Sequence, residues 1–337
     1  MAAIPQGAIR FNTDSQKLEF YAQDQWWEMV IDTPNLGTGA NTTAGARGLF
    51  GGGSPTTGGN IIDYVTITST GNAISFGNLD DNIKYLSAFS SSTRGVWGGG
   101  ETAPAGYRNQ IRYVTISSTG DSLSFGTLTT ATTYIGALSN STRGIFAGGK
   151  VAPAPTTFTN TIQYVTIAST GNAVSFGQLS QTRSNVMGTA SPTRGLFAGG
   201  YTPVRQNTID YITVSTLGNA TSFGNLTLAR NGSNAAASPT RALFFCADVS
   251  PYTTIDYVTI STLGNAVNFG NVTNITGYGA ATSNSVRGIA GGGQSPGNTN
   301  AIEYVNISTQ ANSVSFGQLT TTLHQAGGAC SNAHGGL

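Results

Sequence analysis

The chain has 337 residues, of which 9% are charged and 38% are hydrophobic, and its net charge is +1. A disordered chain would combine low hydrophobicity with high net charge, so this composition favours a folded protein. The balanced charge gives no basis for binding nucleic acid or an anionic membrane. The sequence has no apolar run that could span a bilayer, and its start lacks the basic residues and apolar core of a signal peptide.

Residues 1–34 are predicted to form three short strands, over 8–13, 17–22 and 25–31, separated by turn residues at 14–16 and 23–24. Three strands joined by tight turns make a meander. Residues 34–45 then lead into a different pattern.

After residue 45, one sequence repeat occurs six times. Its clearest copy, residues 193–226, contains the segments TRGLFAGG, IDYITVS, GNA and SFGNL. Its tyrosines are spaced 49, 51, 47, 46 and 47 residues apart. A period near 50 predicts an array of supersecondary units, each unable to bury its apolar face alone. The recurring residues are Arg47, Arg94, Arg143, Arg194, Arg241 and Arg287; Tyr64, Tyr113, Tyr164, Tyr211, Tyr257 and Tyr304; and Phe76, Phe125, Phe176, Phe223, Phe269 and Phe316.

Each repeat is predicted to contain four strands and no helix. The first is built of small residues, as at 188–191 and 234–238, which suits an inner strand where sheets converge on an axis. The second ends in paired glycines, the third alternates as in IDYVTI, and the fourth follows a Gly-Asn turn.

The recurring residues are interpreted as structural. The glycine pairs mark a close approach or a positive φ, since a phosphate-binding loop would need a helix after it. The tyrosines and phenylalanines are expected to pack between adjacent sheets, and the arginines to anchor a turn or a contact between sheets. Cys246 and Cys330 are expected to be buried small residues rather than a disulfide. The fifth repeat has Phe245-Cys246 in place of the glycines, so its backbone is expected to differ there.

This order of strands resembles the kelch repeat over residues 38–337, through the glycine pair that closes strand two and the aromatic residues of strands three and four. The usual tryptophan of strand four is Phe in all six repeats. The resemblance implies an all-β propeller.

The strand count favours seven four-stranded blades in a single domain over 1–337. The segment 325–337 matches strand one, with His334 where arginine normally stands, and the three N-terminal strands would complete this closing blade. The alternative is six blades plus a separate N-terminal β-hairpin module at 1–34.

In such a propeller, strands alternate in direction, so the near-identical turns lie on one face and the variable connections on the other. We predict a binding face on the variable side, because aromatic and arginine side chains commonly anchor interfaces. Its candidate residues are Lys84, Tyr85, Tyr107, Arg108, Phe158, Arg183, Tyr201, Arg205 and Tyr252.

No catalytic constellation is expected. The two histidines, His324 and His334, have no metal-ligand spacing, and no Ser-His-Asp or paired-carboxylate arrangement can be drawn from so few charges. Copper-oxidase relatives of kelch propellers need a ligand set that this chain does not supply. The prediction is a non-enzyme without metal or cofactor.

The stretch GAIRFNTDSQKLEFYAQDQWWEMV (residues 7–30) resembles a short segment of tail fibre and other virion proteins of tailed bacteriophages, including cyanophages. The residues that carry the match are Gly7, Ile9, Arg10, Phe11, Asn12, Thr13, Leu18, Glu19, Tyr21 and Trp26. The resemblance implies a virion structural protein of a tail fibre, baseplate or capsid decoration. Its partners would be other virion proteins and a host glycan or surface protein. A kelch-like interaction module without a virion role is the alternative.

Overall fold

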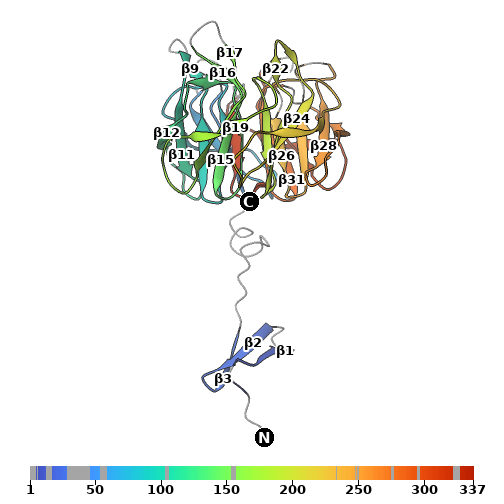
Figure 1. Ribbon diagram of the computed structural model, residues 1–337. Coiled ribbons are helices and arrows are strands. Elements are labelled where there is room, and N and C mark those ends of the chain that lie inside the picture. Colours follow the sequence, from blue (N-terminus) through green and yellow to red (C-terminus); the bar gives the residue numbers. More distant parts are fainter. Residues whose placement is uncertain are drawn as a thin grey trace. The chain divides into compact units, whose positions relative to one another are not determined.

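The computed structural model describes residues 5, 7–12, 17–28, 46–53, 59–102, 106–152, 157–232, 234–246, 248, 250–274, 277–293, 297–321 and 327–337. The chain divides into two compact units, Met1–Gly45 and Ala46–Leu337 (Figure 1). The second unit is called the body below. Within the described ranges there is no helix, and hence none long and apolar enough to cross a membrane.

The first unit is the predicted meander. Its antiparallel strands β1 (Ile9–Asn12), β2 (Lys17–Ala22) and β3 (Gln25–Glu28) form one three-stranded sheet. On one face, Arg10 pairs with Glu19 at 2.8 Å and lies 4.2 Å from the ring centroid of Trp26. Tyr21 meets the same indole edge-on at 5.3 Å. Four residues of the virion-like pattern therefore contact one another. Residues 13 and 29–31 lie outside the described part.

The body is all-β and propeller-like, with six four-stranded antiparallel sheets among its described residues. We call them blades 1 to 6 and give their strands from the innermost outward. Blade 1 has β34 (Gly328–Ser331), β4 (Arg47–Gly51), β5 (Ile61–Thr66) and β6 (Ile74–Asn78). Blade 2 has β7 (Ser87–Ser90), β8 (Arg94–Gly98), β11 (Gln110–Thr115) and β12 (Leu123–Thr127). Blade 3 has β14 (Gly136–Ser139), β15 (Arg143–Ala147), β18 (Thr161–Thr166) and β19 (Val174–Gln178).

Blade 4 has β20 (Met187–Ala190), β21 (Arg194–Ala198), β24 (Thr208–Thr213) and β25 (Thr221–Asn225). Blade 5 has β26 (Asn234–Ala237), β27 (Arg241–Phe245), β28 (Thr254–Thr259) and β29 (Val267–Asn271). Blade 6 has β30 (Ala280–Ser283), β31 (Arg287–Gly291), β32 (Ala301–Asn306) and β33 (Val314–Gln318). The predicted four strands per repeat, with small residues innermost, are confirmed in blades 2 to 6.

The predicted closing blade is wrong. Among the described residues, strands β1 to β3 pair only with one another, and strand β34 pairs with β4 inside blade 1. Asn332 accepts the backbone N–H of Arg47 at 2.9 Å, as Asn284 accepts that of Arg287 within blade 6. The chain end thus supplies strand one and its turn to the first repeat. The strand count from the sequence was wrong because it gave the first repeat its own strand one before Arg47.

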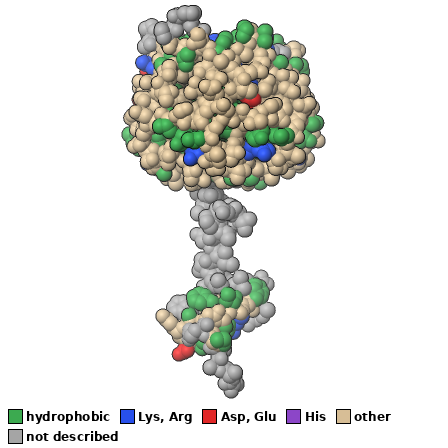
Figure 2. Space-filling model, viewed as in Figure 1, with side chains coloured by type: hydrophobic (Ala, Val, Ile, Leu, Met, Phe, Trp, Pro, Cys, Tyr) green, Lys and Arg blue, Asp and Glu red, His purple; other side chains and the backbone are tan. Residues whose placement is uncertain are grey.

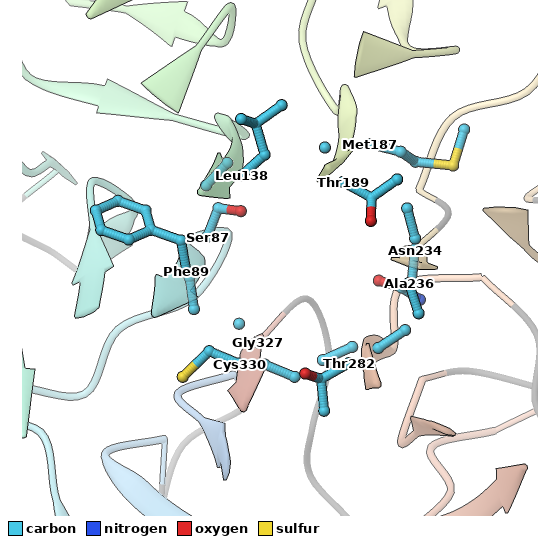
Figure 3. A pocket seen from close by; sticks show the side chains of 18 of the residues that line it. Ser87, Phe89, Leu138, Met187, Thr189, Asn234, Ala236, Thr282, Gly327 and Cys330 are labelled. Carbon is cyan, nitrogen blue, oxygen red and sulfur yellow. The ribbon is translucent and has the colours of Figure 1, made fainter. Parts of the chain in front are cut away.

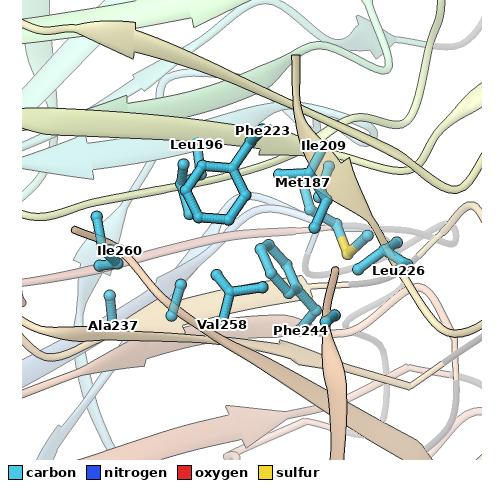
Figure 4. Packing of buried hydrophobic residues seen from close by; sticks show 12 residues of the cluster. Met187, Leu196, Ile209, Phe223, Leu226, Ala237, Phe244, Val258 and Ile260 are labelled. Carbon is cyan, nitrogen blue, oxygen red and sulfur yellow. The ribbon is translucent and has the colours of Figure 1, made fainter. Parts of the chain in front are cut away.

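The innermost strands contact one another in the order β34, β7, β14, β20, β26, β30 and back to β34. The apolar core is correspondingly divided into six clusters, each shared by two adjacent blades. Figure 4 shows the cluster in which Leu196 and Phe223 of blade 4 meet Phe244 and Val258 of blade 5. In every repeat the tyrosine of strand three meets the phenylalanine of strand four edge-on, at 5.9–6.2 Å. The predicted packing of these rings between sheets is confirmed.

The recurring arginines join blades, as predicted. Each lies 4.6–5.0 Å from the ring centroid of its own repeat's tyrosine and donates to a backbone carbonyl of the next blade. The pairs are Arg47 with Ile116, Arg94 with Ile167, Arg143 with Val214, Arg194 with Ile260, Arg241 with Ile307, and Arg287 with Ile67 of blade 1. All six blade interfaces carry this contact.

The Gly-Asn turns between strands three and four form a second contact between blades. In blade 5, Gly264 and Ala266 donate their N–H groups to Phe223 and Asn225 of blade 4, and Asn265 Oδ1 accepts from Asn225. A Cβ on Gly224 would lie 2.1 Å from the Gly264 carbonyl oxygen, so the Phe-Gly dipeptide admits no side chain there. This turn covers the outer edge of the preceding blade, where an open edge would invite aggregation. Its counterparts are Asn72, Asp121, Asn172, Asn219 and Asn312.

The glycine pairs after strand two have positive φ, as predicted; Gly199 and Gly200 have φ of 62° and 107°. Cys246 adopts the same left-handed conformation, with φ of 63°. The expectation of a different backbone in the fifth repeat is therefore wrong at Cys246. A non-glycine residue tolerates this conformation at some cost in strain. Cys246 and Cys330 are both buried and form no disulfide, as predicted, and burial raises the pKa of each thiol to about 12.

Replacing Arg194 with Met tests the inter-blade contact. The variant loses a charge-assisted hydrogen bond and a cation–π contact, so we expect the free energy of unfolding of the body to fall by about 2 kcal/mol. Urea denaturation followed by circular dichroism measures it. Arg10→Met, in the first unit, is the control and leaves the body's transition in place. Equal transitions for both variants would contradict the assigned role.

Candidate binding face and central channel

The variable connections carry small additional strands that gather at one face of the body, while the C-terminus lies at the opposite face (Figure 1). The two-to-three loops form the pairs β9 (Glu101–Thr102) with β10 (Gly106–Tyr107), β16 (Lys150–Val151) with β17 (Thr157–Phe158), and β22 (Tyr201–Thr202) with β23 (Val204–Arg205). Strand β13 (Thr132–Thr133) joins β16. These loops are thus ordered by backbone pairing.

Four predicted binding residues lie around the first of these loops. Lys84 pairs with Glu101 at 3.3 Å, and its ammonium lies 5.1 Å from the ring centroid of Tyr85. Arg108 pairs with Asp81 at 2.9 Å. Tyr107 is half-buried in β10. The charged ends of Lys84 and Arg108 are therefore held by partners from a neighbouring connection.

The other predicted residues extend the same face. Phe158 and Tyr201 meet edge-on at 5.9 Å, across two blades. Arg205 pairs with Asp248 at 2.9 Å. Tyr252 is 51% exposed. Sequence reasoning missed Lys150, whose ammonium lies 5.7 Å from the ring centroid of Phe158.

The prediction of Arg183 as a surface residue is wrong, because its side chain is fully buried. It pairs with Asp210 at 2.8 Å and donates to the carbonyls of Gly199 and Thr208. Its role is to hold the connection between blades 3 and 4. Burial lowers the pKa of the Arg183 guanidinium, and the Asp210 carboxylate opposes that shift.

Three tyrosines line the channel opening on this face: Tyr85, which was predicted, and Tyr134 and Tyr278, which sequence reasoning missed. Tyr85, Tyr134 and Tyr278 come just before the innermost strands of blades 2, 3 and 6, and all have positive φ, of 55° to 66°. Asn185 and Gly232 hold the same place before β20 and β26, with φ of 54° and 61°. Aligning KYLSAFS, TYIGALS and GYGAATS across the repeats would have revealed this recurrence. We call these five residues the collar.

Backbone hydrogen bonds link the collar residues between blades. Tyr134 donates its N–H to the Tyr85 carbonyl at 2.9 Å, and Asn185 donates to Tyr134 at 2.8 Å. Tyr278 donates to Gly232 at 2.5 Å. The rings of Tyr85 and Tyr134 are stacked, with centroids 4.0 Å apart. Burial, and then a hydrogen bond with Tyr85, raise the pKa of the Tyr134 phenol.

Below the collar lies a central channel lined by all six innermost strands (Figure 3). Phe89 and Met187 are directed away from the axis into the core, whereas Ser87 and Asn234 are partly exposed on the lining. The cavity volume of the channel, counted as the space that the centre of a water molecule can occupy, is about 130 Å³. Since one water needs roughly 10–15 Å³ by this measure, the space suits a small ligand.

The far end of the channel is tied together by serine hydroxyls and the chain's last residues. Ser139 donates to Ser90, Ser90 to Ser331, and Ser283 to Ala237, each to a carbonyl of an adjacent innermost strand at 2.6–2.7 Å. His334 completes the arrangement. Gly336 donates its N–H to Nδ1 of His334, so Nε2 carries the proton and donates to the Ser90 carbonyl at 3.0 Å.

The residues after His334 extend across this end. The Gly335 N–H donates to the Ala237 carbonyl in blade 5, and a Cβ on Gly336 would lie 2.0 Å from the Ser139 carbonyl in blade 3. The channel is therefore obstructed at this end by the tail, and its other end carries the collar.

Among the described residues, the channel lining contains no Asp, Glu, Lys or Arg. Charged side chains instead border the collar, where the ammonium groups of Lys84 and Lys150 lie 5.1 Å and 4.8 Å from the ring centroids of Tyr85 and Tyr134. Figure 2 shows few charged side chains on the visible surface of the body. Over the described ranges, no three His, Cys, Asp or Glu side chains are grouped so as to hold a metal ion. His324 lies outside those ranges. In comparisons with known proteins, no family model matches the chain and no curated sequence matches it significantly.

His334, which is partly buried at the far end of the channel, predicts a pH-dependent stability. Burial lowers its pKa to about 4, from an ordinary value near 6.5. Below pH 6.5 the unfolded chain takes up a proton that the folded chain does not, so stability falls as the pH drops from 6.5 towards 4. The slope from this one group approaches 1.4 kcal/mol per pH unit.

Urea denaturation between pH 7 and pH 4.5 measures this slope. The control is His334→Gln, which keeps a donor but cannot titrate. Its stability is expected to depend less steeply on pH than that of the wild type. Identical slopes would show that His334 is not the titrating group.

Proposed function

We propose that the protein is a bacteriophage virion structural protein that acts as a non-enzymatic adhesion module. In this proposal the body is a six-bladed propeller, closed by the pairing of β34 with β4. Its variable face meets a host receptor, and residues 1–34 attach it to other virion proteins. The observation that carries the adhesion role is the difference between the two faces of the body.

The face that carries the Gly-Asn turns contacts neighbouring blades. The Gly-Asn turns, which recur with little change, are hydrogen-bonded to the neighbouring blade at every interface. The other face differs from blade to blade, both in the length of its loops and in the aromatic and charged residues they carry. Because these differences leave the inter-blade contacts intact, this face is free to specialise in recognition.

The first unit supports an attachment role. Its sheet has Arg10, Glu19, Tyr21 and Trp26 in contact on one face. On the other face, the apolar side chains of Ile9, Phe11 and Phe20 are 63%, 58% and 36% exposed. A small sheet with one uncovered apolar face gains stability by packing against a partner. In our proposal that partner is another virion protein.

The attachment role is tested with the double variant Ile9→Ser, Phe11→Ser. We expect the wild-type chain to co-purify with phage particles in fixed stoichiometry and the variant to be depleted from them at least tenfold. The body's Tm is expected to stay unchanged, which separates lost attachment from lost folding. A wild-type chain absent from purified particles would overturn the virion role.

The adhesion role is tested with the double variant Tyr107→Ala, Tyr252→Ala on the variable face. Aromatic anchors contribute strongly to interfaces, so we expect host-cell adsorption to weaken about tenfold with an unchanged Tm. Adsorption is measured as depletion of free particles by host cells. A parallel loss of thermal stability would count against a direct role in binding.

A further inference from the structure

We propose that the collar and the channel beneath it form a binding site for the terminal unit of an uncharged glycan. This inference rests on the proposed adhesion function and gives it a location and a ligand class. It starts from the collar residues, whose backbone conformation is costly for any residue other than glycine.

The three collar tyrosines are unlike ordinary loop residues. A left-handed conformation disfavours bulky side chains, yet it recurs at Tyr85, Tyr134 and Tyr278 in three different blades. Strain of this kind persists where the surrounding structure enforces it, and it concentrates at ligand sites. Here the backbone hydrogen bonds between blades enforce it.

The three collar tyrosines line the channel. The rings of Tyr85 and Tyr134 are stacked, with centroids 4.0 Å apart. Blades 3 and 6 are opposite one another in the order of innermost strands, so Tyr134 and Tyr278 line the channel from opposite sides. The tyrosine hydroxyls and the Asn185 amide supply both donors and acceptors to this lining.

The channel below continues this chemistry without charge. Ser87 and Asn234, the first residues of β7 and β26, provide a hydroxyl and an amide, while Ala235, Ala281 and Ala329 provide apolar surface. Burying an unpaired charged group here would be costly, so the lining favours a neutral ligand. A sugar ring, with hydroxyls at its edge and C–H groups on its faces, matches this mixture of groups.

The shape of the site indicates the end of a glycan rather than its middle. Residues 334–336 lie across the far end of the channel, in contact with blades 2, 3 and 5. A polymer cannot thread through such a space. A single terminal residue can enter from the collar, with the remainder of the glycan extending over the variable face.

The test uses the intact chain on an array of neutral and acidic glycans, followed by calorimetric titration of the best ligand. The triple variant Tyr85→Phe, Tyr134→Phe, Tyr278→Phe keeps the rings and removes the hydroxyls. Three lost hydrogen bonds predict affinity at least tenfold weaker. Tyr211→Phe removes a hydroxyl from a repeat tyrosine outside the site, and its affinity is expected to match the wild type.

A second variant keeps the test valid if the triple tyrosine variant fails to fold. Asn234→Leu removes the amide from the channel lining at similar volume, and it is also expected to weaken binding. The proposal is overturned if no neutral glycan binds, or if both variants bind as the wild type does. Binding of acidic glycans alone, abolished by Lys150→Gln, would overturn the neutral class.

The outcome is separable from that of the adhesion proposal. Adsorption that depends on Tyr107 and Tyr252 but not on the collar hydroxyls would leave adhesion standing and refute the collar site. If the chain binds a glycan through the collar but neither joins particles nor adsorbs to cells, the collar site stands and the adhesion proposal is refuted.

Discussion

The body depends on one contact repeated around a ring, in which each blade holds the next through backbone groups. An arginine over a tyrosine ring donates to a carbonyl of the following blade. A Gly-Asn turn returns hydrogen bonds to the outer strand of the preceding one. With only 9% charged residues, the chain relies little on surface ion pairs. It relies instead on apolar clusters shared by neighbouring blades and on hydrogen bonds that involve main-chain groups.

This arrangement explains how the sequence is divided between constant and variable parts. Positions such as Gly224, which faces a neighbour's carbonyl oxygen, tolerate no side chain. Buried polar positions in strand three vary more, yet remain paired. Asp210 meets Arg183, whereas in blade 2 the charges are exchanged and Arg112 meets Asp80. The connections beyond these anchors pair with one another through residues that differ between blades, such as Lys84 with Glu101 and Arg205 with Asp248.

Much of the fold could be predicted from the sequence, because period, strand patterns and turns are local signals. The role of the arginines and the left-handed glycines also followed from their positions. The sequence identified residues 325–337 as a strand one but not its partner, because the pairing of β34 with β4 joins segments from opposite ends of the repeat array. At the candidate site, the sequence did not predict which side chains are exposed. Arg183 looks like any loop arginine until its buried partner Asp210 is placed beside it. Tyr134 and Tyr278 recur in the aligned repeats, but their left-handed backbone conformation is visible only in the structure.

The near-equivalence of the six interfaces has an evolutionary consequence. A coding segment exchanged between two repeats by recombination would bring its own arginine, glycine and asparagine, and would fit its new neighbours on both sides. Only the outer loops would change. Such a gene can reshuffle what its product recognises while the scaffold stays intact, which is an advantage for any protein whose target changes faster than its own architecture can.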